Sequence, residues 1–121
     1  MQTTQKNFYK KLFGKIGENQ AVKYLKKQKC KILEKNYKNY IGEIDIICKD
    51  KEYTVFVEVK TRVNDSFGAP SEAVNRQKQQ KYFKVATEYL QKRGLLETPC
   101  RFDVIEIEDG KINHIKDAFY M

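Results

Sequence analysis

Two apolar segments of this chain are interrupted by charged residues at positions where a buried strand would normally carry Val or Ile. Asp45 lies in the segment 41–48, and Glu58 and Lys60 lie in the segment 53–62. Charged side chains are rarely buried unless they are paired, hydrogen-bonded or bound to a metal ion. The pattern therefore restricts the chain to folds in which neighbouring strands share a polar site, and it is typical of metal-dependent phosphodiesterases.

The short polar turn 49–52 joins these segments and predicts an antiparallel hairpin. Residues two apart on a strand share a face, so Glu58 and Lys60 are expected to point the same way. A four-residue loop places Asp45 directly opposite Glu58, and a two-residue loop places it diagonally on the same face. A loop with an odd number of residues would place Asp45 on the far face. The first two alternatives bring the carboxylates together.

Opposed carboxylates repel and raise each other's pKa unless a cation lies between them. A hard divalent cation with oxygen ligands, Mg²⁺ or else Mn²⁺, suits Asp45, Glu58 and the main-chain carbonyl of Val59. Such an ion would polarise a scissile phosphate and lower the pKa of a bound water. Lys60 is expected to position that water or to neutralise the charge that develops on the phosphate.

Alternating charges are also ordinary on an exposed strand, so a cross-strand salt bridge on a solvated sheet face is the alternative. Against it, Thr54 and Phe56 share the face of Glu58, and the other face carries the apolar residues Val55, Val57 and Val59. A strand that is apolar on both faces is typical of the centre of a covered sheet. The charged residues are therefore expected to lie beneath other elements.

Hydrophobic periodicity and turn residues divide the rest of the chain into two helices, three further strands and a loop. The helices are predicted at about 6–28 and 71–93, the strands at 30–36, 101–108 and 111–115, and the loop at 63–70. The order α-β-β-β-α-β-β predicts one α/β domain over residues 1–121. We expect a mixed central sheet of about five strands, flanked by two long helices.

Glu18 in the first helix is expected to face the sheet, because it precedes the apolar residues Ala21 and Leu25 by three and seven positions. An ionised glutamate that faces inward needs a partner, and a metal-bound water would provide one. The alternative is a pair with a lysine at the helix margin. Gly14 and Gly17 lie on the same stripe, where they would allow another segment to approach closely.

The net charge of +8, from 24 Lys and Arg against 16 Asp and Glu, favours a nucleic-acid partner through phosphate neutralisation. A solvated basic surface is the alternative. Three widely spaced cysteines and a single histidine give no zinc pattern. No apolar run exceeds four residues, so we expect a cytoplasmic protein without a membrane segment. Asp103 and His114 are expected to have structural roles.

Several short motifs together resemble the YraN-type family of small predicted endonucleases, also designated UPF0102. They lie, in order, at 14–18, 42–45, 56–62, 67–70, 72–74 with Lys78, and 101–104. That family belongs to the PD-(D/E)XK superfamily and is similar to archaeal Holliday junction resolvases. The resemblance implies a restriction-endonuclease-like core, and Ile44 replaces the proline that usually precedes the aspartate. It implies a catalytic set at Glu18, Asp45, Glu58 and Lys60.

Four residues outside this set are expected to contact nucleic acid: Arg62, Gln77, Lys78 and Lys81. Gln77 follows from the resemblance, since related nucleases often carry a glutamine or lysine on a helix near the site. For the basic residues, the expectation follows from their charge and position. The alternative for them is a surface salt bridge or a solvated helix face.

The predicted function is Mg²⁺-dependent hydrolysis of phosphodiester bonds in structured or branched DNA, with a role in DNA repair or recombination. So small a chain has little room for a base-reading domain, which favours recognition of shape and backbone. Resolvase-like action on two strands would require a homodimer. One alternative is a catalytically silent nucleic-acid-binding accessory protein with a nuclease-like fold. Another is a small basic structural protein with a salt-bridged sheet.

Overall fold

A computed structural model describes the fold of residues 2–62 and 75–119, and the side chains from residue 11 onward. The elements follow the predicted order. They are α1 (Gln2–Lys27), β1 (Lys31–Lys38), β2 (Glu43–Asp50), β3 (Tyr53–Arg62), α2 (Arg76–Lys92), β4 (Cys100–Glu108) and β5 (Lys111–Phe119). The loop predicted at 63–70 and the helix start predicted at 71 lie outside the described residues. Within them, no helix is both long and apolar enough to cross a membrane.

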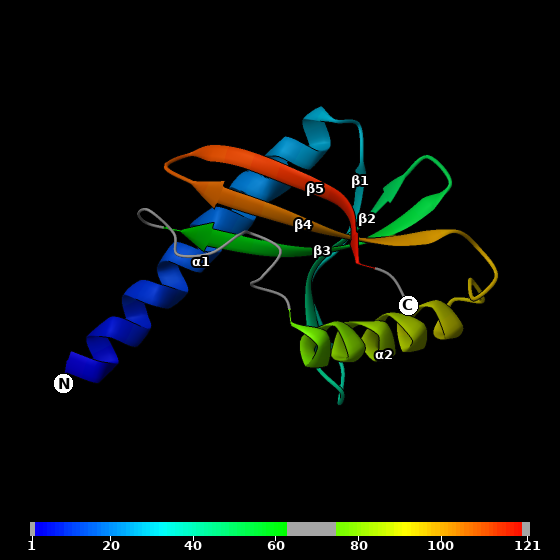
Figure 1. The fold of residues 1–121 in the computed structure, drawn as a ribbon, viewed down its shortest axis with the longest axis horizontal. Helices are drawn as coiled ribbons and strands as arrows, with labels where there is room; N and C mark the ends of the chain where they lie inside the picture. The colour runs from blue at the N-terminus through cyan, green and yellow to red at the C-terminus, as the bar shows by residue number, and fades with distance from the viewer. Residues whose placement is uncertain (1, 63–74, 120–121) are drawn as a thin grey trace.

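The strands form one mixed sheet in the order β1-β2-β3-β4-β5, with β3 and β4 parallel and every other neighbouring pair antiparallel. The parallel pair requires a crossover, and α2 lies between β3 and β4 in the chain. The two helices cover opposite faces of the sheet, and the N-terminal half of α1 projects beyond it (Figure 1). This is the predicted mixed α/β sheet with two flanking helices.

Alternate residues of β3 belong to two separate apolar clusters. Val55 and Val57 pack with Leu25 of α1, whereas Phe56 packs with Tyr89 of α2, whose ring lies 5.9 Å away. Residues 54–58 are all buried. The expectation of a central strand covered on both faces is therefore confirmed, and a solvated sheet face is excluded.

The start of α2 is fixed by a side-chain cap. Asn75 has extended backbone angles, and its side-chain oxygen accepts a hydrogen bond from the Lys78 backbone N–H at 2.9 Å. The helix ends before Gly94, whose φ of +68° is the left-handed conformation that glycine tolerates. The predicted C-terminal end of this helix is confirmed.

The last strand is longer than predicted, because it continues from the expected end at residue 115 to Phe119. The polar pair Lys116–Asp117 interrupts the apolar alternation. However, the ladder continues past a bulge, and Phe119 pairs with Phe102 of β4. The Asp117 backbone N–H donates to the Asp103 carboxylate at 3.0 Å, a long-range contact that local sequence does not reveal.

Candidate functional site

The β2–β3 hairpin brings two carboxylates side by side. Its pairing runs to Ile46 with Val57, directly before Asp45 and Glu58, and these two carboxyl groups are close enough for the charge of Glu58 to act on Asp45. The Val59 backbone N–H donates a 2.8 Å hydrogen bond to Asp45 Oδ2, which connects the two strands at this point. The hairpin has the register expected for a loop from Asp50 to Tyr53, although Asp50 and Tyr53 themselves pair and leave only Lys51 and Glu52 in the turn.

The surroundings of Asp45 disfavour its negative charge. Burial, and next to it the charge of Glu58, raise the pKa of Asp45 from 3.8 to about 7, although the hydrogen bond from Val59 opposes the shift. Glu18 adds a smaller repulsion. A proton or a nearby cation would relieve this unfavourable charge.

Glu58 is buried, and one of its oxygens contacts two ammonium groups. Lys78 Nζ lies 3.1 Å from Glu58 Oε1, and Lys60 Nζ lies 3.4 Å from the same atom. Glu58 and Lys60 thus share a face, as predicted. Burial, and then the adjacent Lys78, lower the pKa of Lys60, while Glu58 acts in the opposite direction. Lys60 therefore loses a proton more readily than a solvated lysine.

Glu18 approaches the same strands from the other side of the sheet. It lines a small cavity of about 70 Å³ together with Asp45, beneath α1. Burial raises the pKa of Glu18, although a hydrogen bond with Asn36 lowers it. The prediction that this residue faces the sheet is confirmed.

The close approach expected at the two glycines of α1 is present at one of them. A Cβ at Gly17 would overlap the Thr61 hydroxyl of β3, whereas nothing lies within 4 Å of a Cβ placed at Gly14. Gly17 therefore sets the distance between α1 and β3. Glu18 follows directly in the chain, so this contact also positions Glu18.

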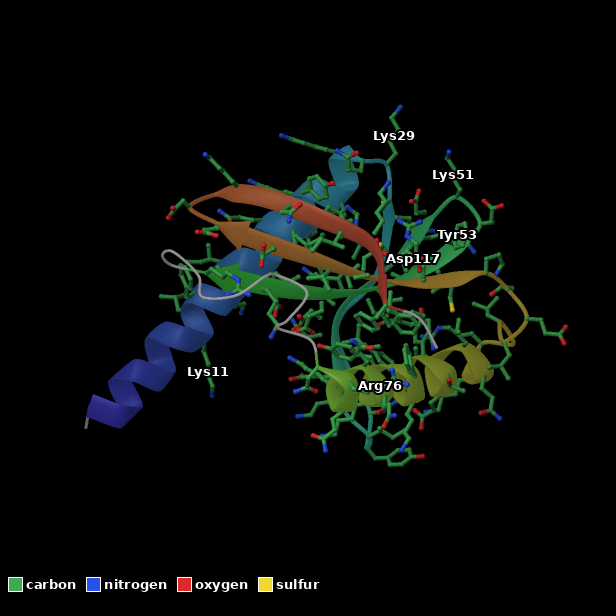
Figure 2. The ribbon with its side chains drawn as sticks, viewed as in Figure 1. Lys11, Lys29, Lys51, Tyr53, Arg76 and Asp117 are labelled. Atoms are coloured by element: carbon green, nitrogen blue, oxygen red, sulfur yellow. The ribbon has the colours of Figure 1, made fainter. Side chains whose placement is uncertain are left out.

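A larger cavity of about 780 Å³ lies between the β1–β2 turn, the hairpin and the start of α2. Asp45 and Glu58 line it from the sheet, and Gln77, Lys78 and Lys81 line it from α2. Figure 2 shows α2, on which Arg76 is labelled, with side chains of the helix and of the strands extending into the space between them. Three of the four residues expected to contact nucleic acid thus border the cavity that contains the carboxylates.

Arg62, the fourth of these residues, does not line that cavity. Its Nε donates to Glu106 Oε2 at 2.9 Å, and only 20% of its side chain is exposed. The structure therefore has the salt bridge that was the alternative for Arg62.

The donor set fits a hydrated hard cation. In the described part of the chain, no group of three or more His, Cys, Asp or Glu residues could hold a metal ion. Mg²⁺, however, is commonly held by one or two carboxylates and keeps several waters. Asp45 and Glu58 provide two carboxylates, and burial together with the charge of Glu58 raises the pKa of Asp45. Mg²⁺ or Mn²⁺ suits this pair, whereas the four nitrogen or sulfur ligands of a structural zinc site are not assembled here.

Comparison with known proteins identifies the family. Residues 17–107 match the uncharacterised protein family UPF0102. The chain belongs to this family. A UPF0102 protein of Clostridioides difficile is 51% identical and one of Clostridium beijerinckii is 47% identical, each over 88% of this chain and at least 91% of the relative. The resemblance to the YraN-type family is therefore confirmed, and the matched UPF0102 region contains all four residues of the predicted catalytic set.

Sequence reasoning missed the contact between Lys78 and Glu58 in this UPF0102 protein. Lys78 was expected to bind nucleic acid, but its ammonium group lies on a candidate metal ligand. The sequence does contain an indication that Lys78 faces the sheet, since Lys78 precedes the buried residues Tyr82 and Val85 by four and seven positions. Such spacing places a helical side chain on the face that packs against the sheet.

A second polar cluster lies on the α1 face of the sheet. Asp103 is fully buried and accepts hydrogen bonds from Arg101 Nε at 3.1 Å and from the Asp117 backbone N–H at 3.0 Å. His114 Nε2 lies 2.7 Å from Asp103, and its other ring nitrogen lies 3.0 Å from the Tyr24 hydroxyl of α1. Each of these polar groups has a partner, which supports the structural roles expected for Asp103 and His114.

Proposed function

We propose that this UPF0102 protein is a Mg²⁺-dependent endonuclease that hydrolyses phosphodiester bonds in structured or branched DNA. The observation that carries the proposal is the adjacent carboxylates Asp45 and Glu58, with Lys60 against Glu58, in a cavity that two further lysines line. Without a cation such a pair weakens the fold, because like charges are held together away from water. A metal-binding role explains why both carboxylates are present.

Each side chain has a separate task in this proposal. Asp45 and Glu58 hold the ion, which when bound polarises the scissile phosphate and acidifies a water. Lys60 orients the attacking water, and its lowered pKa also suits it to accept a proton. Glu18, which shares a cavity with Asp45, holds a water on the α1 side.

The proposed substrate follows from charge and from the shape of the cavity. The net charge of +8 favours a polyanion, and Lys78 and Lys81 place positive charge beside the carboxylates. Contacts of this kind bind phosphates rather than bases, so they favour DNA recognised by its backbone and shape. Cleavage of both strands of a junction would require two copies of the chain, because each copy supplies one site.

The direct test is a cleavage assay on supercoiled, linear, single-stranded and four-way-junction DNA. Wild type and Asp45→Asn would be compared with Mg²⁺, with Mn²⁺ and with a chelator. Wild type should cleave only with a metal. The variant should cleave under no condition, but in chelator it should bind DNA as well as wild type does. Glu52→Gln is the matched control, because Glu52 is an exposed carboxylate in the hairpin turn. Equal cleavage by wild type and Asp45→Asn would reject the assigned site.

A catalytically silent DNA-binding accessory protein is the second candidate. One observation favours it: Glu58 already contacts two ammonium groups, which neutralise it without a metal. DNA binding without cleavage on every substrate and with either metal would support this candidate. No binding of any nucleic acid at low salt would reject both candidates.

A further inference from the structure

Lys78 and Lys60 share a single oxygen of Glu58, although they come from different elements. Lys60 is on the same strand as Glu58, two residues away, whereas Lys78 reaches the carboxylate from the first turn of α2. The helix lysine makes the shorter contact, at 3.1 Å against 3.4 Å. A residue proposed to hold a cation is therefore already paired with a cation of the protein itself.

The position of Lys78 follows from the way α2 begins. Asn75 accepts a hydrogen bond from the Lys78 backbone N–H, which fixes the backbone of Lys78 at the edge of the cavity. Its side chain extends past Tyr82, with Nζ 6.0 Å from the centre of that ring. Tyr82 is itself buried against the sheet. The contact with Glu58 is thus supported by the helix cap and by core packing.

A divalent cation and an ammonium group cannot both occupy the free side of the same carboxylate oxygen, because the two positive charges repel at such short distances. Of the two lysines, Lys78 can leave more easily. Its side chain is 37% exposed, against 27% for Lys60, and it lines the large cavity. Lys60, in contrast, is held beside Glu58 by the strand that carries both residues.

We infer that Lys78 occupies the cation position of Glu58 when no metal is bound, and that metal binding releases it to a DNA phosphate. The identity of the cation and of the polyanion rests on the proposed function. Gln77 and Lys81 line the same cavity, so the released ammonium group joins a surface suited to a phosphate backbone. Metal and DNA then strengthen each other's binding, and this linkage must be reciprocal.

The first test measures metal affinity by calorimetry, without DNA, using Mg²⁺ and Mn²⁺. Lys78→Met should bind either ion about fivefold more tightly than wild type or better, because the competing ammonium group is gone. Lys81→Met removes the same charge from the same cavity, one helical turn away, and should change the affinity less than twofold. An unchanged affinity in Lys78→Met, or equal gains in both variants, would overturn the inference.

The second test measures the linkage itself, as the affinity for a labelled four-way junction with Ca²⁺ or with a chelator. Ca²⁺ is used because it is a hard cation with the same preference for oxygen ligands. Wild type should bind the junction at least about fivefold more tightly with Ca²⁺, and Lys78→Met should lose most of this gain. A gain that persists in full in Lys78→Met would assign the linkage to another residue.

Two further variants separate this inference from the function on which it rests. Lys78→Arg keeps a cation at the position and should behave more like wild type than like Lys78→Met, and melting curves would confirm that each variant folds. An absence of metal binding in wild type, or metal binding unaffected by Asp45→Asn, would overturn the proposed function and the inference together. Metal binding that requires Asp45 but does not respond to Lys78→Met would overturn the inference alone.

Discussion

Asp45 is the residue at which stability and the proposed function oppose each other. Its carboxyl group is partly buried beside Glu58, and one backbone N–H is not enough to offset the loss of water and the repulsion. Glu58 is buried more completely, but two lysines neutralise it. The unfavourable negative charge of the site is therefore mainly that of Asp45.

The free energy of unfolding of the metal-free protein should consequently depend on pH through Asp45. Its pKa rises from 3.8 to about 7 on folding, so the folded state binds the additional proton between these values. Stability from this group is therefore full at low pH and falls as pH rises from about 4 to 7. Asp45→Asn removes the effect while keeping an oxygen for the Val59 N–H, and it should stabilise the protein by about 2 to 4 kcal/mol at pH 8.

Melting temperatures of wild type and Asp45→Asn, measured in chelator from pH 4 to pH 9, would check this. The two curves should nearly meet at pH 4 and separate as pH rises. Curves that stay parallel would show that Asp45 does not carry the titration. Saturating Mg²⁺ should raise the melting temperature of wild type more than that of the variant, because only wild type keeps both carboxylates.

Single residues also show how much of the site could be predicted. Asp45, Glu58 and Lys60 were found because a charge in an apolar strand needs a partner, which is a local property of the sequence. The partner itself is not local. Lys78 reaches Glu58 because α2 packs against β2 and β3, and this arrangement depends on tertiary packing rather than on local sequence. Residue types were thus predictable, whereas the pairing across elements was not.

At the scale of elements, alternation and turn chemistry predicted most of the fold. The bounds predicted for β3 agree with the structure, because its apolar residues are bounded by polar turn residues on the N-terminal side. The predicted end of β5 was wrong. Lys116 and Asp117 interrupt the alternation of apolar and polar residues, whereas pairing with β4 continues the strand. The close approach expected at two glycines occurs only at Gly17, because the N-terminal half of α1 extends beyond the sheet (Figure 1).

The two glycines of α1 therefore provide a matched pair of substitutions. Gly17→Ala would place its methyl group against Thr61, force α1 away from β3 and destabilise the protein by about 1 to 3 kcal/mol. Gly14→Ala meets no neighbouring atom and should stabilise the helix by up to about 1 kcal/mol. Denaturant unfolding of both variants would measure these opposite effects.

The double variant Gly17→Ala/Thr61→Ala locates the cause of the destabilisation. Removing the Thr61 hydroxyl and methyl groups makes room for the new methyl group, so the double variant should recover stability relative to Gly17→Ala. If the effects of the two substitutions are simply additive, the contact with Thr61 is not what makes Gly17 necessary.

At the scale of the whole molecule, two polar clusters lie on opposite faces of the sheet. One contributes repulsion that lowers the free energy of unfolding, and the other contributes hydrogen bonds and ion pairs that raise it. Asp45 and Glu58 bring like charges together near α2, whereas Asp103 is surrounded by donors on the α1 face. Arg101 also donates to Asp50 at 2.9 Å, so this second cluster joins β2, β4 and β5, and Tyr24 extends it to α1. The cluster thus stabilises the scaffold that holds the repelling carboxylates together.

Asp103→Asn should accordingly destabilise the whole protein without changing the proposed metal site. Burial acts to raise the pKa of Asp103, but hydrogen bonds with His114 and Arg101 outweigh it and hold that pKa below its usual range. A carboxylate of this kind adds stability at neutral pH and loses it as pH falls through the folded-state pKa. The expected cost at pH 7 is about 2 to 4 kcal/mol, since Arg101 and His114 would both lose the charge of a buried acceptor and Arg101 would keep only its pair with Asp50.

The pH dependence distinguishes the two aspartates. Denaturant unfolding in chelator should show a cost for Asp103→Asn that is largest near neutral pH and shrinks in acid. The gain for Asp45→Asn should instead grow as pH rises from 4 to 7. Metal affinity should fall in Asp45→Asn and stay within about twofold of wild type in Asp103→Asn, because Asp103 lies on the other face of the sheet. A loss of metal binding in folded Asp103→Asn would mean that the two faces are not independent, and that the α1-side cluster sets the geometry of the carboxylate pair.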